Sequence, residues 1–121
     1  KPEVYTLDHV FSPANTTHDV YHVVAKKIVM SAMEGFNGTI FAYGQTSSGK
    51  TYTMQGKRDE KTGILKEKGV IPLAVEDIFD YISQHSEREF LLRVQYIEIY
   101  NEKIMDLMGT NSDCPLREDP H

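Results

Sequence analysis

A glycine-rich loop at residues 44–51 constrains this 121-residue chain more than any other feature. Its sequence, GQTSSGKT, matches the phosphate-loop pattern G-x-x-x-x-G-K-[ST] at every fixed position. Glycine lets the backbone turn tightly and approach phosphates, and successive N–H groups then face inward as an anion-binding nest. The loop therefore predicts a site for the phosphates of a nucleoside triphosphate.

Two side chains at the end of the loop have distinct roles in the predicted site. The ammonium of Lys50 reaches the β- and γ-phosphates, and the hydroxyl of Thr51 binds a Mg²⁺ ion that bridges them. A helix that begins at Lys50 also directs its positive dipole end to this place. The candidate phosphate-binding residues are Gly44, Gln45, Thr46, Ser47, Ser48, Gly49, Lys50 and Thr51, with Thr51 as the metal ligand.

The segments around the loop predict an α/β fold with a parallel sheet. Residues 39–43 are short, nearly all apolar and not alternating, which is typical of a strand buried on both faces. Residues 4–11 predict an edge strand, and residues 90–100 predict a longer one. A strand followed by a glycine loop and a helix places the loop at the carboxyl end of the strand, where α/β folds bind ligands.

Helices are expected between these strands. Thr16 and Asp19 resemble a capping box at the start of the first helix, and Gly35 is its expected stop. A second helix is expected from Lys50, and a third from the Val-Ile-Pro step at residues 70–72, where proline is tolerated in the first turn.

Two shorter segments complete the expected secondary structure. Residues 57–68 are polar and locally positive, and we expect a solvated surface loop there. Ile104, Leu107 and Met108 are spaced as in one turn of helix.

Composition and charge exclude several classes of protein. The net charge of −5 argues against a nucleic-acid-binding protein, and no apolar run approaches the roughly 18 residues of a membrane span. No signal-peptide pattern opens the chain, so a cytosolic or nuclear protein is expected. The single cysteine, Cys114, cannot form an internal disulfide. We expect no metal site among the histidines, which appear scattered along the sequence at positions 9, 18, 22, 85 and 121.

Several motifs in order resemble one family over essentially the whole chain. Residues 37–54, NGTIFAYGQTSSGKTYTM, resemble the ATP-binding signature of the kinesin motor domain almost residue for residue. Residues 5–11, 69–72 and 96–102 resemble further kinesin motifs, the last being the Tyr-x-Glu-Ile-Tyr-Asn-Glu signature. The resemblance implies a P-loop NTPase-type fold, with a central mostly parallel sheet flanked by helices. Residues 88–94 are similar to the centromere-associated mitotic branch.

The resemblance also implies cofactors and partners. ATP and Mg²⁺ would bind at residues 45–51, and Tyr52 matches the position whose ring lies beside the adenine. Residues 56–68 match the variable loop near the nucleotide site, where allosteric inhibitors act in some relatives. The implied partner is the microtubule (tubulin), with no nucleic acid and no membrane, and a homodimer through other segments stays open. The implied location is the cytoplasm and the microtubule cytoskeleton or spindle, with the kinetochore as the more specific alternative.

The departures from the family's pattern shape the functional hypothesis. Residues 1–121 are expected to be a partial motor domain, since both switch motifs and the main microtubule-binding elements would lie beyond His121. No catalytic residue is assigned, because no group that positions water is identified, and Asp106 is not taken as a second metal-site acid. The main hypothesis is a microtubule motor ATPase whose isolated 121-residue chain is marginally stable and turns over little ATP. The alternatives are a non-catalytic kinesin-like module that binds microtubules or nucleotide, and an unrelated P-loop protein.

Overall fold

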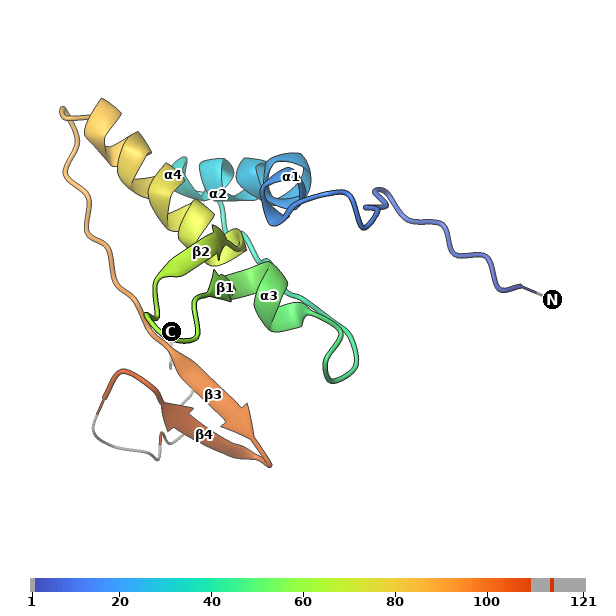
Figure 1. Cartoon of the computed structure of the whole chain (residues 1–121). Helices are drawn as coiled ribbons and strands as arrows, with labels where there is room; N and C mark the ends of the chain where they lie inside the picture. Colours follow the sequence, from blue (N-terminus) through green and yellow to red (C-terminus); the bar gives the residue numbers. More distant parts are fainter. Residues whose placement is uncertain (1, 110–113, 115–121) are drawn as a thin grey trace. The chain divides into compact units, whose positions relative to one another are not determined.

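The computed structural model describes residues 2–109 and 114, and the chain forms two compact units, Lys1–Arg88 and Glu89–His121. Figure 1 shows the elements of both units. The first unit contains α1 (Thr17–Val20), η1 (Tyr21–Ala25), α2 (Lys26–Met33), α3 (Lys50–Gln55), β1 (Gly56–Arg58), β2 (Leu65–Lys68) and α4 (Val70–Gln84). The second contains β3 (Ile97–Tyr100) and β4 (Lys103–Asp106).

The elements α1, η1 and α2 follow one another without a break, with a π-helical stretch at η1. The predicted capping box is confirmed: the hydroxyl of Thr16 accepts from the N–H of Asp19 at 3.2 Å, and the Asp19 carboxylate accepts from the N–H of Thr16 at 2.8 Å. The helical segment ends where expected, at Gly35, which has a φ of 101° that glycine adopts without strain.

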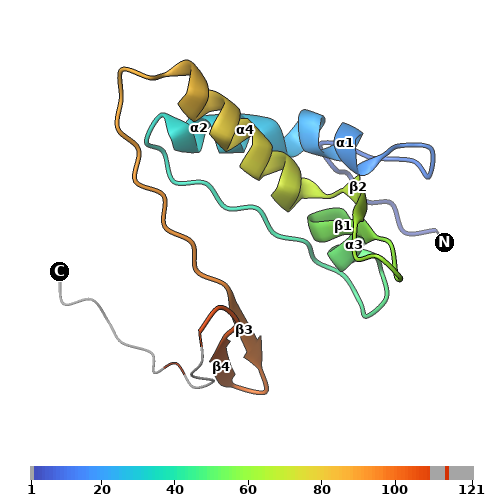
Figure 2. The same cartoon turned by 60° about the vertical axis from the view of Figure 1, so that its left-hand side comes forward.

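The core of the first unit lies between this helical segment and α4. Figure 2 shows α4 alongside α2, and the two helices are in contact. The buried apolar residues are Tyr21, Ala25, Val29, Val70 and Leu73. Partly buried Ile40, Met54, Ala74 and Ile78 pack against them. The predicted third helix is confirmed as α4, with Pro72 in its first turn, where a missing N–H breaks no helical hydrogen bond.

The polar segment at residues 56–68 forms a β-hairpin where a plain surface loop was expected. Strands β1 and β2 pair antiparallel, with a register irregularity between Lys57 and Arg58. At the base of the hairpin, a Cβ on Gly56 would lie 2.0 Å from the carbonyl oxygen of Glu67, so only glycine fits. In the turn, the Asp59 carboxylate accepts from two backbone N–H groups at 2.9 Å.

The strands expected at residues 4–11 and 39–43 are not formed. Phe41 is 80% exposed and Tyr43 is 95% exposed, so the burial predicted for residues 39–43 is wrong here. Within residues 2–109 the sheets are two antiparallel pairs, β1–β2 and β3–β4, and no parallel pairing occurs. A strand exists through its ladder partners, and the described segments provide none for residues 39–43.

The second unit is a hairpin that corrects two further predictions. The strand expected over residues 90–100 is confirmed only at Ile97–Tyr100, and the predicted helical turn at 104–108 is wrong because β4 occupies Lys103–Asp106. Ile104 pairs with Ile99. Asn101 and Glu102, the two residues between the strands, have φ of 48° and 62°, as in the two-residue turn that suits a twisted hairpin. A short apolar run is compatible with either a helix or a strand. Here the two-residue turn brings residues 103–106 beside β3, so they form a strand.

In the part of the chain that the structure describes, no helix has both the length and the apolar character needed to cross a membrane.

Candidate functional site

The glycine loop turns back sharply before it enters α3 (Figure 1). Ser47 has a φ of 63° and Gly49 a φ of 94°, and Gly49 is the N-cap of α3. The N–H of Ser48 donates to the carbonyl of Gln45 at 3.2 Å, which closes the turn. The start of a helix at Lys50 is therefore confirmed, and left-handed residues just before it curl the backbone, as an anion nest requires.

Gly44 is needed at the first position of the loop because the backbone there passes close to a side chain. A Cβ at Gly44 would lie 2.5 Å from the Oγ of Ser48 and 3.2 Å from its Cβ. A larger residue would require the Ser48 side chain to rotate and to shift slightly. The geometry therefore explains the first glycine of the motif by close packing within the loop itself.

The ammonium of Lys50 lies against the loop that precedes it. Its Nζ donates to the carbonyl oxygens of Gly44 at 2.8 Å and Gln45 at 2.7 Å. The charge is thus held beside the curled backbone. Thr51 is exposed on the first turn of α3. Lysine, hydroxyl and curled backbone form a donor set that suits phosphate oxygens and a hard cation.

Tyr52 connects α3 to the hairpin. Its hydroxyl donates to the Glu67 carboxylate on β2 through a short hydrogen bond, and this bond raises the pKa of Tyr52. Tyr52 as a residue is 43% exposed. Sequence reasoning missed Glu67, since only the hairpin brings it to α3.

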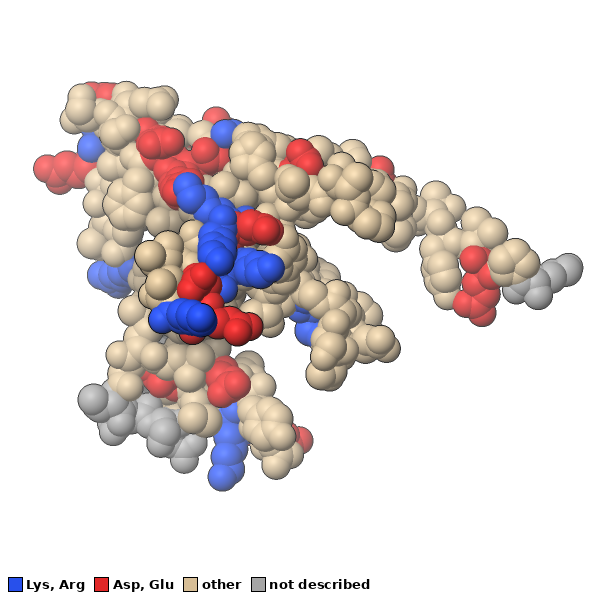
Figure 3. All heavy atoms as spheres, in the orientation of Figure 1, with Lys and Arg blue, Asp and Glu red and all other residues tan. Residues whose placement is uncertain are grey.

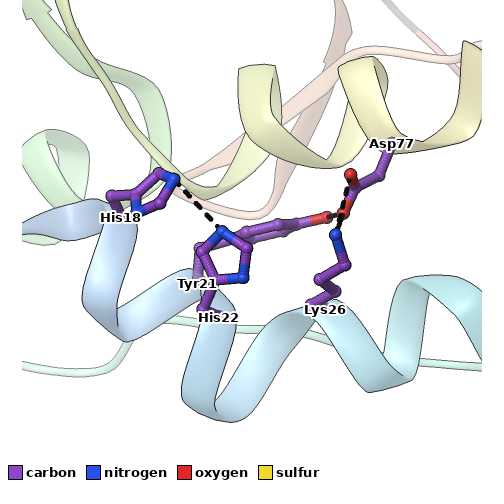
Figure 4. A network of polar contacts seen from close by, with 5 residues as sticks. All are labelled: His18, Tyr21, His22, Lys26 and Asp77. Atoms are coloured by element: carbon purple, nitrogen blue, oxygen red, sulfur yellow. Dashed lines mark hydrogen bonds and ion pairs between the residues drawn. The ribbon is translucent and has the colours of Figure 1, made fainter. Parts of the chain in front are cut away.

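A second polar network joins the first helical segment to α4 (Figure 4). The hydroxyl of Tyr21 donates to Asp77 at 2.7 Å, and the Lys26 ammonium lies 3.1 Å from the same carboxylate. Burial works to raise the pKa of Asp77, but the hydrogen bond from Tyr21 and the Lys26 ammonium outweigh it, so the pKa lies below its ordinary value. Asp77 was not singled out from the sequence, because its partners are 51 and 56 residues away.

The histidine pattern requires a correction. His18 and His22 are four residues apart, which is a helical metal-ligand spacing, and their Nε2 atoms are 3.1 Å apart (Figure 4). The view that the histidines are scattered is therefore wrong for this pair. Among the described residues, no group of three or more His, Cys, Asp or Glu side chains is placed to hold a metal.

Charge on the hairpin is paired in part. Figure 3 shows Lys and Arg side chains gathered over this region, with acidic side chains among them. Lys66 lies 2.6 Å from Asp59, and Lys68 lies 2.5 Å from Glu76 on α4. The local positive charge read from the sequence is thus offset by nearby carboxylates, and the hairpin does not form a purely basic patch.

Comparisons with known proteins agree on one family. The kinesin motor domain family matches residues 1–121. Kinesin-related protein 11 of Dictyostelium discoideum is 53% identical over 109 residues, which cover 90% of this chain and 15% of that protein. Human centromere-associated protein E is 53% identical over 118 residues, which cover 95% of this chain and 4% of that protein.

Two solved structures match the backbone. A fast kinesin, described with its ATPase mechanism and microtubule interactions, matches with a TM-score of 0.85 at 39% identity, over 96% of this chain and 32% of that one. Drosophila NOD, docked with bovine tubulin into a map of nucleotide-free NOD on the microtubule, matches with a TM-score of 0.76 at 34% identity, over 90% of this chain and 38% of that one. The chain thus spans about a third of the solved motors and a smaller share of the curated relatives.

Proposed function

Since this chain belongs to the kinesin motor-domain family and has its α/β fold, we propose that residues 1–121 are the nucleotide-binding part of a motor that hydrolyses ATP to move along microtubules. The curled loop at residues 44–51, with the Lys50 ammonium held against it, is the observation that supports this proposal most directly. Within the described residues the strands form two antiparallel pairs, and the backbone path matches that of the solved motors.

The proposed site uses the loop, Lys50 and Thr51. Bound Mg-ATP supplies the phosphoryl group that is transferred, and Mg²⁺ offsets the charge on its phosphates. Backbone N–H groups of the curled loop would bind phosphate oxygens. On binding, Lys50 would exchange its two carbonyl partners for phosphate oxygens, which are stronger hydrogen-bond acceptors because they carry charge. Thr51 would hold Mg²⁺. No residue of this chain is proposed as the group that positions water.

Tyr52 is proposed to support the adenine with its ring. The residue is 43% exposed while its hydroxyl is bonded to Glu67, and an aromatic ring offers a flat apolar face to a base. In Tyr52→Ala we expect a loss of ATP affinity of about five- to tenfold, but no loss for inorganic tripolyphosphate, which has no base. Tyr52→Phe, which keeps the ring, is the matched control. Equal losses for ATP and tripolyphosphate in Tyr52→Ala would assign the ring to packing alone.

The proposed partner is the microtubule. It is supported by family membership and by the solved NOD structure, which is docked with tubulin. The corresponding location is the microtubule cytoskeleton. The kinetochore is the finer proposal, supported by the similarity to centromere-associated protein E. A chloroplastic kinesin-like protein of Arabidopsis thaliana is equally identical, at 53%, so identity alone does not favour the centromeric branch.

The test is Mg-ATP turnover by the full-length polypeptide that contains this chain, with and without microtubules. Strong stimulation by microtubules that is lost in Lys50→Ala would support the motor. The matched control is Lys61→Ala, which removes the same charge from the hairpin turn. Nucleotide binding without stimulation would instead support a non-catalytic kinesin-like module, and the motor proposal would fail.

A further inference from the structure

His18 and His22 place two ring nitrogens at a metal-binding separation on one helical face. His18 lies in α1 and His22 in η1, and their Nε2 atoms are 3.1 Å apart (Figure 4). The ring centroids are 4.3 Å apart and the rings are tilted by 55°. The two Nε2 atoms are therefore close enough for one ion to bind both, once the rings turn out of their mutual hydrogen bond so that both lone pairs face the ion.

The separation fits a chelated ion quantitatively. Transition metals bind imidazole nitrogen at about 2.0–2.1 Å. Two nitrogens 3.1 Å apart at that bond length make an angle of about 100° at the ion. This lies between the octahedral angle of about 90° and the tetrahedral angle of about 109°, and both geometries are used by metals that prefer imidazole.

The surroundings support the pair and leave room for the ion. The Tyr21 ring packs edge-on against His22 with centroids 5.7 Å apart, and Tyr21 is itself buried and hydrogen-bonded to Asp77. One ring of the pair thus rests on a fixed neighbour. Both histidines are exposed, so water can complete the coordination. Asp19 is engaged in the helix cap and Asp77 with Tyr21 and Lys26. On the other side, His18 lines a pocket with two lysines and two glutamates, Lys66, Lys68, Glu67 and Glu76.

The same contact also describes a hydrogen bond between two neutral rings, with the N–H of one donating to the other. In solvent such a bond contributes little, because water replaces it. A metal ion that binds both nitrogens therefore displaces only a weak contact.

From this geometry we infer that His18 and His22 form a two-histidine site for a divalent transition-metal ion, with water as the remaining ligands. Zn²⁺ and Ni²⁺ are the appropriate probes, because imidazole suits both and their preferred angles bracket the observed one. The site is independent of the proposed nucleotide site, so either proposal can fail without the other.

The experiment is calorimetric titration of Zn²⁺ and of Ni²⁺ into the untagged chain near neutral pH. We expect one ion per chain in the wild type. His18→Ala and His22→Ala should each weaken binding by at least about tenfold, because the second nitrogen binds intramolecularly. His9→Ala is the matched control and should bind as the wild type does. If no saturable binding is seen up to about 1 mM ion, the inference is overturned. A dissociation constant of that size corresponds to a binding free energy of only about −4 kcal/mol.

A thermal melt provides a second readout. An ion that binds only the folded pair raises the melting temperature by mass action. The rise should occur in the wild type and in His9→Ala and disappear in His22→Ala, whose circular dichroism spectrum should match that of the wild type since His22 is exposed. An equal rise in His22→Ala would also overturn the inference, since the ion would then bind elsewhere.

Discussion

The helical core and the glycine loop belong to the same unit, yet different interactions hold them in place. In the core, Tyr21 and Ala25 are each 1% exposed and depend on α4 for their burial. The loop at residues 44–51 contains no buried residue, and its shape comes from left-handed backbone at Ser47 and Gly49 and from hydrogen bonds within the loop.

The range of the interactions along the chain explains this difference. Tyr21 bonds to Asp77, 56 residues away, and the Thr17 hydroxyl donates to the carbonyl of Lys68, 51 residues away, at 2.6 Å. Lys50 bonds to residues only five and six positions earlier. Substitutions in the core should therefore change the stability of the fold, whereas substitutions in the loop should change ligand binding and leave stability nearly unchanged.

The largest expected effect is that of Tyr21→Ala. It removes the most buried large side chain, and we expect the free energy of unfolding to fall by about 3–5 kcal/mol. Chemical denaturation followed by circular dichroism measures the change. Tyr21→Phe keeps the ring and loses only the hydrogen bond to Asp77, for an expected loss of about 1.5–3 kcal/mol, and it remains informative if Tyr21→Ala does not fold. Equal losses in both variants would contradict the assignment of the ring to the core.

Lys50→Ala should have the opposite profile. We expect Mg-ATP turnover of the full-length polypeptide to fall by about 100-fold or more, because the charge that faces the phosphates is lost. The free energy of unfolding of the chain should change by less than about 1 kcal/mol, as expected for a charge at the surface. A loss of stability as large as that of Tyr21→Phe would contradict the distinction between loop and core, since Lys50 would then stabilise the fold.

Asp77→Asn tests the electrostatic part of the core. Because the folded-state pKa of Asp77 lies below its unfolded value, its ionised form adds stability above the unfolded pKa, and this stability is lost as the pH falls through the folded pKa. We expect a loss of about 1–3 kcal/mol near neutral pH and a flatter stability profile on the acid side. Denaturation at a series of pH values measures both effects. If the free energy of unfolding depends on acid pH as steeply in Asp77→Asn as in the wild type, Asp77 is not the cause of that dependence.

The smallest effect is expected on the hairpin. The Lys66 ammonium, followed by backbone N–H groups of the turn, lowers the pKa of Asp59 to about 2. In Lys66→Ala this pKa should rise toward its ordinary value, as measured by NMR titration of the carboxyl carbon. Lys57→Ala, on the same hairpin, is the matched control. An unchanged pKa in Lys66→Ala would show that the turn N–H groups alone are responsible.

Much of the candidate site and of the helical fold could be predicted from the sequence. The phosphate-loop motif, the Thr16–Asp19 capping box and the proline at the start of α4 are each local patterns, and the last two are confirmed. The histidine pair was also available from the sequence, since its four-residue spacing is visible without a structure. The spacing does not by itself distinguish a pair in contact from two separately solvated side chains.

The hairpin at residues 56–68 and the contacts of Glu67 and Asp77 were not predictable in this way. Glu67 meets Tyr52 only because β2 pairs with β1 in one register, and Asp77 meets Tyr21 only because α4 packs on the helical segment. A charged residue in a polar segment looks the same in the sequence whether its side chain is solvated or bonded to a distant partner.

The sequence alone determined the features that neighbouring residues can establish: the glycine loop, the helix caps, the helical stripes and the resemblance to kinesin motors. Only the tertiary structure decided which apolar segments become strands. Residues 39–43 have the composition of a buried strand, yet Phe41 and Tyr43 are exposed because no described segment pairs with them. Residues 103–106, expected as helix, become β4 because the turn at Asn101 and Glu102 brings them beside β3. The physical reason is that a helix forms its hydrogen bonds within itself, whereas a strand forms them with a partner.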